Sequence, residues 1–363
     1  MSFQLIVLHV GEYVKGGVYT HICNVLERQK NIAEISDVYL CVSKHKSEKE
    51  YPIKNENVLF YKYKRSPLFI LISIITIFLI IRRMQPDVIH VHSTFAGLMV
   101  RIPYLLIKRK AKIIYCAHGW SFLMNTSSLQ RGLYIYIERI LSCVTDLIIN
   151  ISSYENEQSI KVGISEKKSV LIYNGIDEKV QLSTFDTKLN INNDNINILF
   201  VGRFDKQKGL DILLKVINEI KRKDIMFYLI GDYVLTEHKQ VEFPKNVIRL
   251  GWKTRVQIDQ YYSLIDAVVM PSRWEGFGLV AIEAMKNKKP VIASNQGALP
   301  ELIKNEHNGY IFNLDNPITL KELLEKIEKN HLSEMGKNGY EVFLNKFTAD
   351  KMNKQIIRAY MEC

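Results

Sequence analysis

Two successive series of strand-like and helix-like segments, separated by one polar stretch, constrain the fold of this chain most strongly. Helical patterns lie between most strand-like segments of the first series, and this alternation predicts a parallel sheet with helices on both faces. The predicted strands of the first series are Phe3–Val10, Val38–Val42, Val58–Tyr63, Val88–His92, Lys112–Cys116, Asp146–Ile149 and Ser169–Ile172.

The alternation restarts after the polar stretch Glu178–Asn195. The strands predicted there are Ile196–Val201, Met226–Ile230, Val247–Leu250, Ala267–Met270 and Pro290–Ala293. The helices predicted there are Leu210–Lys221, Thr254–Leu264, Leu279–Lys286 and Leu320–Lys329. We therefore predict an α/β fold with two doubly wound domains, and the length of 363 residues fits two domains of roughly 150 residues each. Ligands of open parallel sheets bind beyond the carboxyl ends of the strands, so we expect two such domains to face a central cleft.

The net charge and the cysteine content indicate which kinds of binding partner and which cell compartment to expect. The formal net charge of +11 favours phosphates, nucleotides or an acidic membrane face, although lysines spread over the surface would give the same value. The five cysteines are scattered and form no C-x-x-C, which argues against disulfides and metal sites and fits a reducing compartment. The N-terminus lacks the basic region of a signal peptide, so we expect a cytoplasmic protein.

The longest apolar run is Leu68–Ile81, interrupted only by Ser73 and Thr76. Its 14 residues are short for a membrane-spanning helix, which needs about 20. The basic residues on its flanks are Lys62, Lys64 and Arg65 before it and Arg82 and Arg83 after it. Two interpretations stay open, namely a buried or half-buried helix and a helix that dips into an anionic membrane surface.

The most informative motif spans Glu275 to Glu283, two carboxylates eight positions apart. A glycine-bracketed turn, Gly276-Phe277-Gly278, separates the preceding strand from a helix that starts at Leu279. The free N–H groups and the positive end of that helix make a site for an anion. One carboxylate lies just before the helix and the other about one turn inside it.

Other candidate residues also follow predicted strands. Arg203 and Lys208 flank a turn into a helix, and two cations at such a place suit a diphosphate. Gly16-Gly17 follow the first strand, where they permit either a tight turn or a close approach of backbone to ligand. His118-Gly119 follow another strand, which favours a functional histidine.

His90 and His92 alternate along one predicted strand and therefore lie on one face. We expect a structural or hydrogen-bonding role for them, because the sequence shows no third metal ligand nearby. No D-x-D occurs anywhere in the chain, so a carboxylate-bound divalent cation under a nucleotide diphosphate is not indicated. No G-x-S-x-G nucleophile motif occurs either.

Taken together, these motifs resemble the retaining GT-B glycosyltransferases of family 4. The resemblance covers nearly the whole chain and is more specific in the second half. The matching elements are the Glu275–Glu283 motif, Gly202-Arg203 with Lys208-Gly209, Asn174-Gly175-Ile176-Asp177, Gly16-Gly17, His118-Gly119 and the Pro300-Glu301 turn.

The resemblance implies a GT-B fold of two Rossmann-like domains. We place an acceptor-binding domain at 1–180, a linker at 181–195, a sugar-nucleotide-binding domain at 196–345, and at 346–363 a helix that crosses back to the first domain. It further implies that Arg203 and Lys208 neutralise the donor diphosphate and that Glu283 binds the ribose. Glu275 would contact the donor sugar.

The same resemblance implies roles for backbone near the first helix and the glycine turn. The segment Gly276-Phe277-Gly278-Leu279 would meet sugar and phosphate through its backbone. Gly17 would face the diphosphate or the acceptor, and His118 would lie near the anomeric centre. The catalytic residues implied by the resemblance are then His118, Glu275, Arg203 and Lys208. No metal or cofactor is expected.

The implied reaction moves a hexosyl or N-acetylhexosaminyl group from a nucleotide sugar, with uracil the expected base, to a lipid-linked saccharide. The apolar run with basic flanks suggests an undecaprenyl-diphosphate-linked acceptor at the inner face of the cytoplasmic membrane, as in O-antigen, capsule or other surface polysaccharide synthesis. Two alternatives remain, a sugar-nucleotide 2-epimerase of the same fold and a non-catalytic protein that binds membrane or nucleic acid. No nucleic-acid-binding motif is present, so we expect no nucleic-acid partner.

Overall fold

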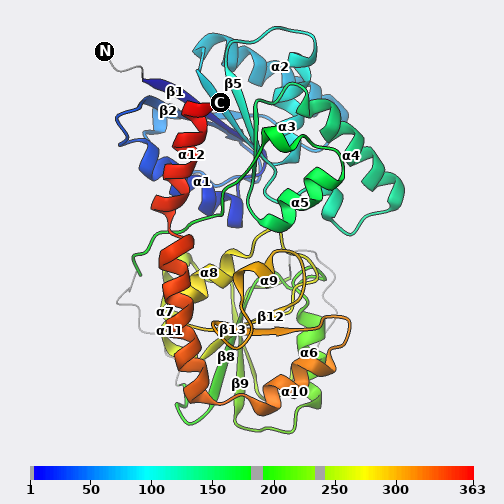
Figure 1. Ribbon diagram of the computed structural model, residues 1–363, viewed down its shortest axis with the longest axis vertical. Helices are drawn as coiled ribbons and strands as arrows, with labels where there is room; N and C mark the ends of the chain where they lie inside the picture. The colour runs from blue at the N-terminus through cyan, green and yellow to red at the C-terminus, as the bar shows by residue number, and fades with distance from the viewer. Residues whose placement is uncertain (1–3, 181–190, 234–241) are drawn as a thin grey trace. The chain divides into compact units, whose positions relative to one another are not determined.

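Strands and helices alternate along the chain and build two all-parallel sheets, which confirms the predicted α/β class (Figure 1). The computed structural model describes residues 4–180, 191–233 and 242–363. Unit 1 comprises Met1–Ile176 with Ala349–Cys363, and unit 2 comprises Asp177–Thr348. Phe3 and most of the predicted linker 181–195 lie outside the described residues.

The sheet of unit 1 has seven strands in the order β3-β2-β1-β4-β5-β6-β7. The strands are β1 (Leu5–Gly11), β2 (Ile35–Ser43), β3 (Val58–Tyr61), β4 (Val88–His92), β5 (Lys112–Cys116), β6 (Leu147–Asn150) and β7 (Ser169–Leu171). The strand order reverses between β1 and β4, which are neighbours in the sheet. Loops that leave this point run to opposite sides and expose backbone to a ligand.

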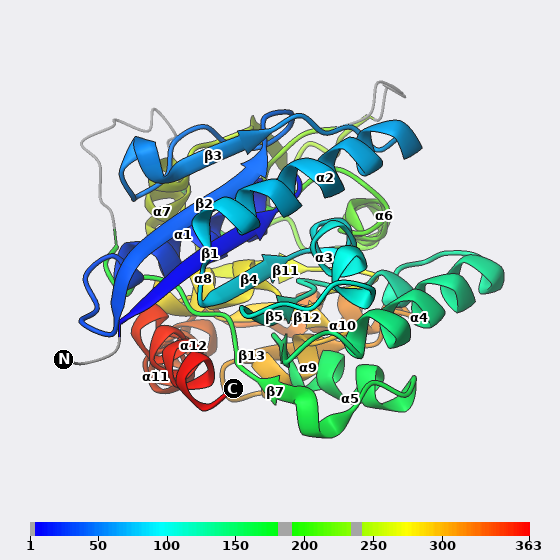
Figure 2. The same ribbon diagram turned by 90° about the horizontal axis from the view of Figure 1, so that it is seen from above.

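Helices cover both faces of this sheet. They are α1 (Gly16–Gln29), α2 (Pro67–Met84), α3 (Thr94–Arg101), α4 (Ser128–Ser142), α5 (Ser153–Lys161) and α12 (Ala349–Glu362). Helices α1 and α12 lie side by side, and α2 packs beside α3 (Figure 2). Strand β4 is covered on both of its faces. Ile89 and Val91 pack into the core with α2 and α3, while the alternate residues His90 and His92 point to the opposite face of the sheet.

Helix α2 is four residues longer than the 14-residue apolar run, since Pro67 occupies its first turn and Met84 its last. Ile77 and Ile81 join the core of unit 1, but only 17% of the helix is buried. Among the described residues it is the one helix long and apolar enough, by length and composition, to cross a membrane, with a mean hydropathy of 2.1. The helix is therefore longer than the apolar run, and most of its side chains are exposed or partly exposed. This packing agrees with both interpretations of the run.

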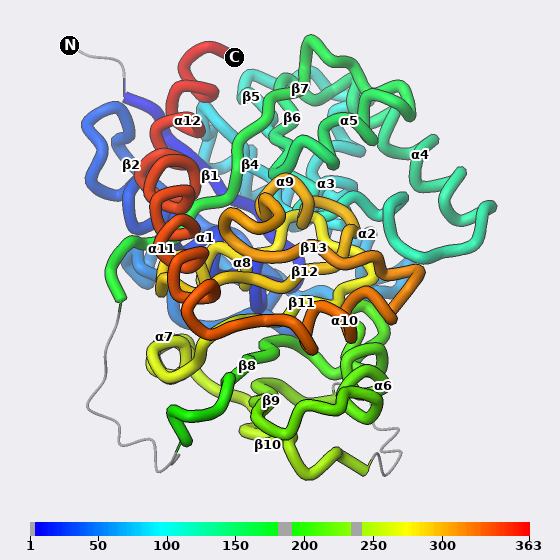
Figure 3. Tube along the Cα trace, turned by 60° about the horizontal axis from the view of Figure 1, so that its bottom comes forward, coloured from blue at the N-terminus to red at the C-terminus, as the bar shows by residue number. Residues whose placement is uncertain are grey.

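The sheet of unit 2 has six strands in the order β10-β9-β8-β11-β12-β13. The strands are β8 (Ile196–Val201), β9 (Ile225–Ile230), β10 (Val247–Gly251), β11 (Ala267–Met270), β12 (Val291–Ser294) and β13 (Gly309–Phe312). The helices are α6 (Leu210–Glu219), α7 (Arg255–Leu264), α8 (Leu279–Lys286), α9 (Leu299–Leu302), α10 (Ile318–Lys326) and α11 (Lys329–Lys346). Helix α6 packs beside α10, and α8 packs beside α11 (Figure 3).

Helix α12 belongs to unit 1 although it follows unit 2 in the chain. Its first residue, Ala349, donates its N–H to the carbonyl oxygen of Ile176 at 2.9 Å. Asn353 Nδ2 donates to the carbonyl oxygen of Asn24 on α1 at 3.1 Å. These bonds fix α12 against α1 and bring Tyr360 over the sheet of unit 1.

Candidate functional site

The site predicted in unit 2 lies where strand order reverses, between β8 and β11. Lys208, in the loop after β8, pairs with Glu275, in the loop after β11, with 2.5 Å between Nζ and Oε1. Ser272 Oγ donates to the same carboxylate oxygen at 2.9 Å. The Glu275 side chain is 8% exposed and that of Lys208 is 20% exposed, so the carboxylate is buried and the ammonium reaches the edge of the interior.

A third loop fixes the backbone of Glu275. Ala298 donates its N–H to the carbonyl oxygen of Glu275 at 3.1 Å. Gly297 makes this approach possible, because its φ is +59° and a Cβ added there would lie 2.2 Å from that oxygen. The predicted turn before Pro300 therefore supports the first glutamate of the motif.

Arg203 lies in the same loop as Lys208. Its guanidinium donates to Gln207 Oε1 at 2.7 Å and lies 3.2 Å from Asp205 Oδ2, with the side chain 47% exposed. Asp205 also accepts the backbone N–H of Lys208 at 3.0 Å. The loop thus holds both predicted cations on a single turn, as their spacing predicts.

The glycine turn of the motif has the predicted geometry. Gly278, with φ +107°, is the residue before the first turn of α8, which begins at Leu279 and contains no acidic residue in that turn. The Phe277 side chain is 3% exposed and packs edge-on against the Phe347 ring. The buried Phe277 ring anchors the turn, and α8 begins where the sequence analysis expects an anion to bind.

Glu283 is on the second turn of α8, in surroundings that differ from those of Glu275. Tyr262 donates its hydroxyl to Glu283 Oε2 at 3.4 Å. Burial raises the pKa of the Glu283 carboxyl, and the Arg255 guanidinium partly offsets this. The sequence analysis did not single out Ser272 or Tyr262, because each meets a glutamate only through the fold.

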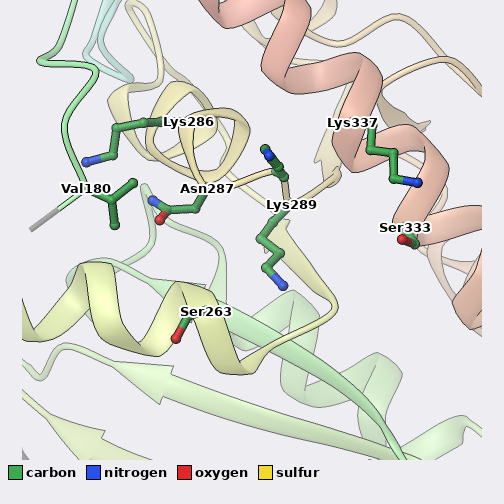
Figure 4. A pocket seen from close by; sticks show the side chains of 8 residues that line it. Val180, Ser263, Lys286, Asn287, Lys289, Ser333 and Lys337 are labelled. Atoms are coloured by element: carbon green, nitrogen blue, oxygen red, sulfur yellow. The ribbon is translucent and has the colours of Figure 1, made fainter. Parts of the chain in front are cut away.

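A lysine-rich pocket of 390 Å³ adjoins the C-terminal end of α8 (Figure 4). Its lining residues are Val180, Ser263, Lys286, Asn287, Lys288, Lys289, Ser333 and Lys337. The Lys286 ammonium is already paired with Asp259 at 2.9 Å. None of the predicted site residues lines this pocket, so it is separate from the Lys208–Glu275 pair.

The residues predicted in unit 1 also follow strands near its reversal of order. Helix α1 begins at Gly16, whose φ is +56° and whose Cβ position is open, and Gly17 is exposed. The first turn of α1 contains no acidic residue. His118 follows β5 and has φ +53°, a left-handed backbone that non-glycine residues adopt at a cost.

His118 is joined to a group of buried histidines. Its Nε2 lies 2.9 Å from Nδ1 of His92, and the ring of His21 packs edge-on at 4.4 Å between centroids. His9 on β1 is the register partner of His90 on β4, and its Nδ1 lies 2.9 Å from Nε2 of His92.

The expectation that no third ligand lies near His90 and His92 was therefore wrong. Parallel pairing of β1 with β4 supplies His9, and two groups of three histidines have nitrogen atoms within 4.8 Å of one another. The expected hydrogen-bonding role does hold for both strand histidines. Burial lowers the pKa of His9 and of His21 to about 4, so these rings are neutral near pH 7.

Two family models match the chain. Residues 15–180 match the model described as "Glycosyltransferase Family 4", and residues 183–342 match "Glycosyl transferases group 1". Together the two matched segments contain the predicted site residues of both units.

Relatives align over nearly the whole chain. An uncharacterized 41.2 kDa protein from the cps region of Klebsiella pneumoniae is 36% identical, over 98% of this chain and 99% of that protein. An uncharacterized glycosyltransferase of Methanocaldococcus jannaschii is 31% identical, over 96% of this chain and 95% of that protein. The Escherichia coli UDP-Gal:alpha-D-GlcNAc-diphosphoundecaprenol alpha-1,3-galactosyltransferase is 25% identical, over 80% of this chain and 79% of that protein. Other relatives are named for O-antigen and capsular polysaccharide biosynthesis.

Solved structures share the fold. Sucrose-phosphate synthase from Thermosynechococcus elongatus superposes with a TM-score of 0.80 at 20% identity, covering 99% of this chain and 98% of that one. Anabaena HepE in complex with UDP-glucose superposes with a TM-score of 0.78 at 16% identity, covering 99% and 100%. The chain belongs to the family 4 glycosyltransferases and has the GT-B fold.

Proposed function

We propose that this glycosyltransferase moves a hexosyl or N-acetylhexosaminyl group from a UDP-sugar to a lipid-linked saccharide, with retention of anomeric configuration. The observation that supports the donor site best is the Lys208–Glu275 pair beside the start of α8. It combines a cation, a carboxylate and free backbone N–H groups at the reversal of strand order in unit 2.

Each part of the donor has a matching group in unit 2. Arg203 and Lys208 neutralise the diphosphate, and the N–H groups at Gly278 and Leu279 bind its oxygens. Glu283 accepts hydrogen bonds from the ribose hydroxyls. Gly276 and Phe277 line the sugar through their backbone.

The proposed chemistry depends on stabilising the leaving group. Breaking the anomeric C–O bond leaves negative charge on the UDP phosphate, and preorganised cations and N–H groups lower the energy of that charge. We assign Glu275 no covalent role, since Lys208 and Ser272 hold its Oε1 as a fixed negative charge. Glu275 instead stabilises positive charge on the sugar, and the acceptor oxygen attacks on the face from which UDP departs.

The leaving phosphate accepts the proton of the acceptor hydroxyl in this mechanism, so a protein general base is not required. We propose that the enzyme needs no metal or cofactor for transfer, since Arg203 and Lys208 supply positive charge and the sequence contains no D-x-D.

The proposed acceptor is a saccharide on undecaprenyl diphosphate at the cytoplasmic face of the membrane. The exposed apolar side chains of α2 support this, and they are Leu68, Leu71, Ile72, Ile75 and Leu79. Unit 1 adds the exposed apolar residues Ile102, Leu105 and Leu106, and on α4 Leu129 and Leu133. Basic residues at both ends of α2 complement anionic headgroups. We therefore propose peripheral association of unit 1 with the inner membrane surface.

A thermal-shift screen against a panel of sugar nucleotides tests the donor site, because a ligand of the folded state raises apparent stability. We expect one UDP-sugar to stabilise the protein and to lose this effect in Arg203→Ala and Lys208→Ala. Product analysis with and without acceptor then separates transfer from 2-epimerisation, which would change the sugar without an acceptor. A protein that binds no sugar nucleotide would contradict the proposal.

A further inference from the structure

The lysine-rich pocket beside α8 lies at the edge of the unit 2 sheet opposite to the proposed donor site. Helix α8 begins after the carboxyl end of β11 and runs back for eight residues, about 12 Å, toward the amino end of β12. Val268 of β11 is the register partner of Val291, the first residue of β12, so the segment 286–289 lies near the amino ends of both strands. A ligand in this pocket therefore does not overlap the donor site.

The turn that carries two of the lysines is held in a fixed conformation. Lys288 has φ +56°, a left-handed backbone that a lysine adopts only where its surroundings impose it. Its carbonyl oxygen faces Gly336 of α11, where a Cβ would lie 2.0 Å away. The backbone N–H groups of Lys288 and Lys289 donate to Met285 and Ala284 of α8, at 2.9 Å each. The turn is thus fixed between α8 and α11, and it offers a ligand its side chains rather than its N–H groups.

Lys286 is the one lysine of the pocket that forms an ion pair within the described part of the chain. Its ammonium lies 2.9 Å from Asp259 and points away from Lys289 (Figure 4). The Lys288 ammonium lies over the Tyr340 ring, 5.0 Å from the ring centroid, which leaves its charge uncompensated. The pocket lysines that no described carboxylate neutralises by an ion pair are Lys288, Lys289 and Lys337.

The charge of Lys289 is costly at its position. Its side chain is partly buried, and burial lowers the pKa of the ammonium. Asp266 offsets this in part, but that carboxylate already pairs with Lys329 at 3.3 Å. A partly buried cation without a close partner lowers stability, and departures of this kind are typical of functional positions.

Helix α11 supplies a lysine and a hydroxyl to the other side of the pocket. Ser333 and Lys337 are four residues apart, so they lie on one face of the helix. Both are exposed, and no described residue forms a hydrogen bond or ion pair with either side chain. Figure 4 shows both on a different element from Lys289, so a ligand in the pocket meets cations from two sides.

This set of donors fits an anion with two phosphate groups. Lysine binds phosphate as a point charge, and a serine hydroxyl donates to a further oxygen. One phosphate monoester carries about −1.5 to −2 charges near pH 7, which two lysines balance, so a second phosphate group engages the third lysine. The volume of 390 Å³ is within the range of small-molecule sites, about 300–1,000 Å³.

We propose that Lys288, Lys289, Lys337 and Ser333 form a second anion site in unit 2, which binds a soluble small molecule with two phosphate groups, such as a diphosphate. The site belongs to unit 2 alone and does not depend on the proposed donor or acceptor. The bound ligand compensates the charge of Lys289 and connects the turn after α8 to α11, so it stabilises the folded protein.

Calorimetric titration of the full chain with inorganic pyrophosphate tests this site. Pyrophosphate also resembles the diphosphate of the donor, so the titration uses the double variant Arg203→Ala with Lys208→Ala, which removes that site. At about 0.15 M salt, where long-range attraction is screened, we expect the double variant to keep one pyrophosphate site. Adding Lys289→Met and Lys337→Met should raise its Kd about tenfold or more, because two of the three cations are lost.

The matched control adds Lys215→Met and Lys326→Met to the same double variant. These lysines are exposed on α6 and α10, so the control removes the same charge and should leave the Kd unchanged. Thermal unfolding checks the fold: without ligand, Lys289→Met should unfold at the wild-type temperature or above it, since it removes a partly buried charge. A lower unfolding temperature would make Lys289 a structural residue and contradict the proposal.

Three further results would overturn the proposal. They are no pyrophosphate binding by the Arg203→Ala, Lys208→Ala variant, equal Kd values with and without the two methionines, and loss of UDP-sugar binding in Lys289→Met with Lys337→Met. If these two methionines instead reduced partition onto phosphatidylglycerol vesicles and left pyrophosphate binding unaltered, the lysines would serve lipid headgroups and not a soluble ligand. A failure of the proposed donor site looks different, because UDP-sugar binding would then be absent in the wild type.

Discussion

The ammonium of Lys208 lies 2.5 Å from the carboxylate of Glu275, across the reversal of strand order in unit 2. The two residues are 67 positions apart in the chain, and each follows a strand at the middle of the sheet. Without ligand the two charges compensate each other. A donor diphosphate would share the lysine, so the pair connects the phosphate end of the donor to its sugar end.

The first prediction concerns this pair. Lys208→Met removes a cation from the developing phosphate charge, and we expect kcat/KM for the UDP-sugar to fall about 10²–10³-fold. The variant also leaves the Glu275 carboxylate with Ser272 as its remaining partner on Oε1, at a cost of about 1–3 kcal/mol in the free energy of unfolding. Lys215→Met, at an exposed position of α6, is the control and should change neither quantity. Equal activities of the two variants would refute a role for Lys208 in leaving-group stabilisation.

The second prediction compares two glycines. Gly297→Ala places a Cβ 2.2 Å from the carbonyl oxygen of Glu275 at a φ of +59°, so the loop must move and Glu275 with it. We expect the free energy of unfolding to fall by about 1–3 kcal/mol, as for other strained substitutions. We also expect the UDP-sugar to bind more weakly.

Gly132→Ala is the matched control for Gly297→Ala. Gly132 is exposed on α4 with nothing within 4 Å of its Cβ position, so alanine should stabilise the helix by roughly 0.5–1 kcal/mol. Urea unfolding and UDP-sugar titration measure both effects. If Gly297→Ala matched the wild type in both, the loop would not support Glu275.

The third prediction is a loss of stability in mild acid. The five clustered histidines His9, His21, His90, His92 and His118 all have a pKa lowered by burial. The unfolded chain, with histidine pKa values near 6.5, binds more protons than the folded chain below that pH. The free energy of unfolding therefore rises with pH, and it decreases as the pH falls through 6.5.

The size of this effect follows from the same linkage. Each histidine contributes about 0.8 kcal/mol between pH 8 and pH 6, hence about 4 kcal/mol for the cluster. Urea titrations at the two pH values measure it. A difference below about 1 kcal/mol would mean that these rings accept protons in the folded state.

The fourth prediction concerns the exposed face of α2. Leu71, Ile75 and Leu79 are 55%, 52% and 59% exposed and lie one turn apart. Changing all three to Gln removes apolar side chains from the membrane contact, and we expect partition onto anionic vesicles to fall tenfold or more. Raising the salt to about 1 M should release the wild type, because the basic flanks are then screened.

Two variants in unit 2 are controls for the vesicle experiment. Trp252→Gln and Ile318→Gln also remove exposed apolar side chains and should leave partition unchanged. Unaltered partition of the folded α2 variant would place membrane contact elsewhere or exclude it.

Local pattern predicts most elements, because strands buried in a parallel sheet are short apolar runs. Val88–His92 and Leu279–Lys286 have the predicted bounds. Helix α11 was missed, since its sequence contains Gly336 and Gly339, which normally indicate turns. Gly336 is there because α11 approaches the Lys288 carbonyl, where a Cβ would lie 2.0 Å from the oxygen. The need for glycine at this helical position is therefore visible only in the tertiary packing.

The candidate site was predictable residue by residue but not as a set of contacts. The Glu275–Glu283 spacing indicates a strand, a turn and a helix, and these form as expected. The pairing of Lys208 with Glu275 depends on which strands become neighbours. The histidine cluster depends in the same way on β1 pairing with β4 and on the return of α12 to unit 1. The hydrophobic pattern of a short segment predicts its own secondary structure, but it does not predict which distant segments will lie next to it.

The measurement that tests the account most directly is the stereochemistry of transfer without metal. The purified protein is incubated with its UDP-sugar and an undecaprenyl-diphosphate-linked N-acetylhexosamine in excess EDTA, and proton NMR reports the anomeric configuration of the product. We predict acceptor-dependent release of UDP and a new linkage with the α configuration of the donor. An inverted linkage, a glycosyl adduct on Glu275, or transfer abolished by EDTA and restored by a divalent cation would contradict the proposed mechanism.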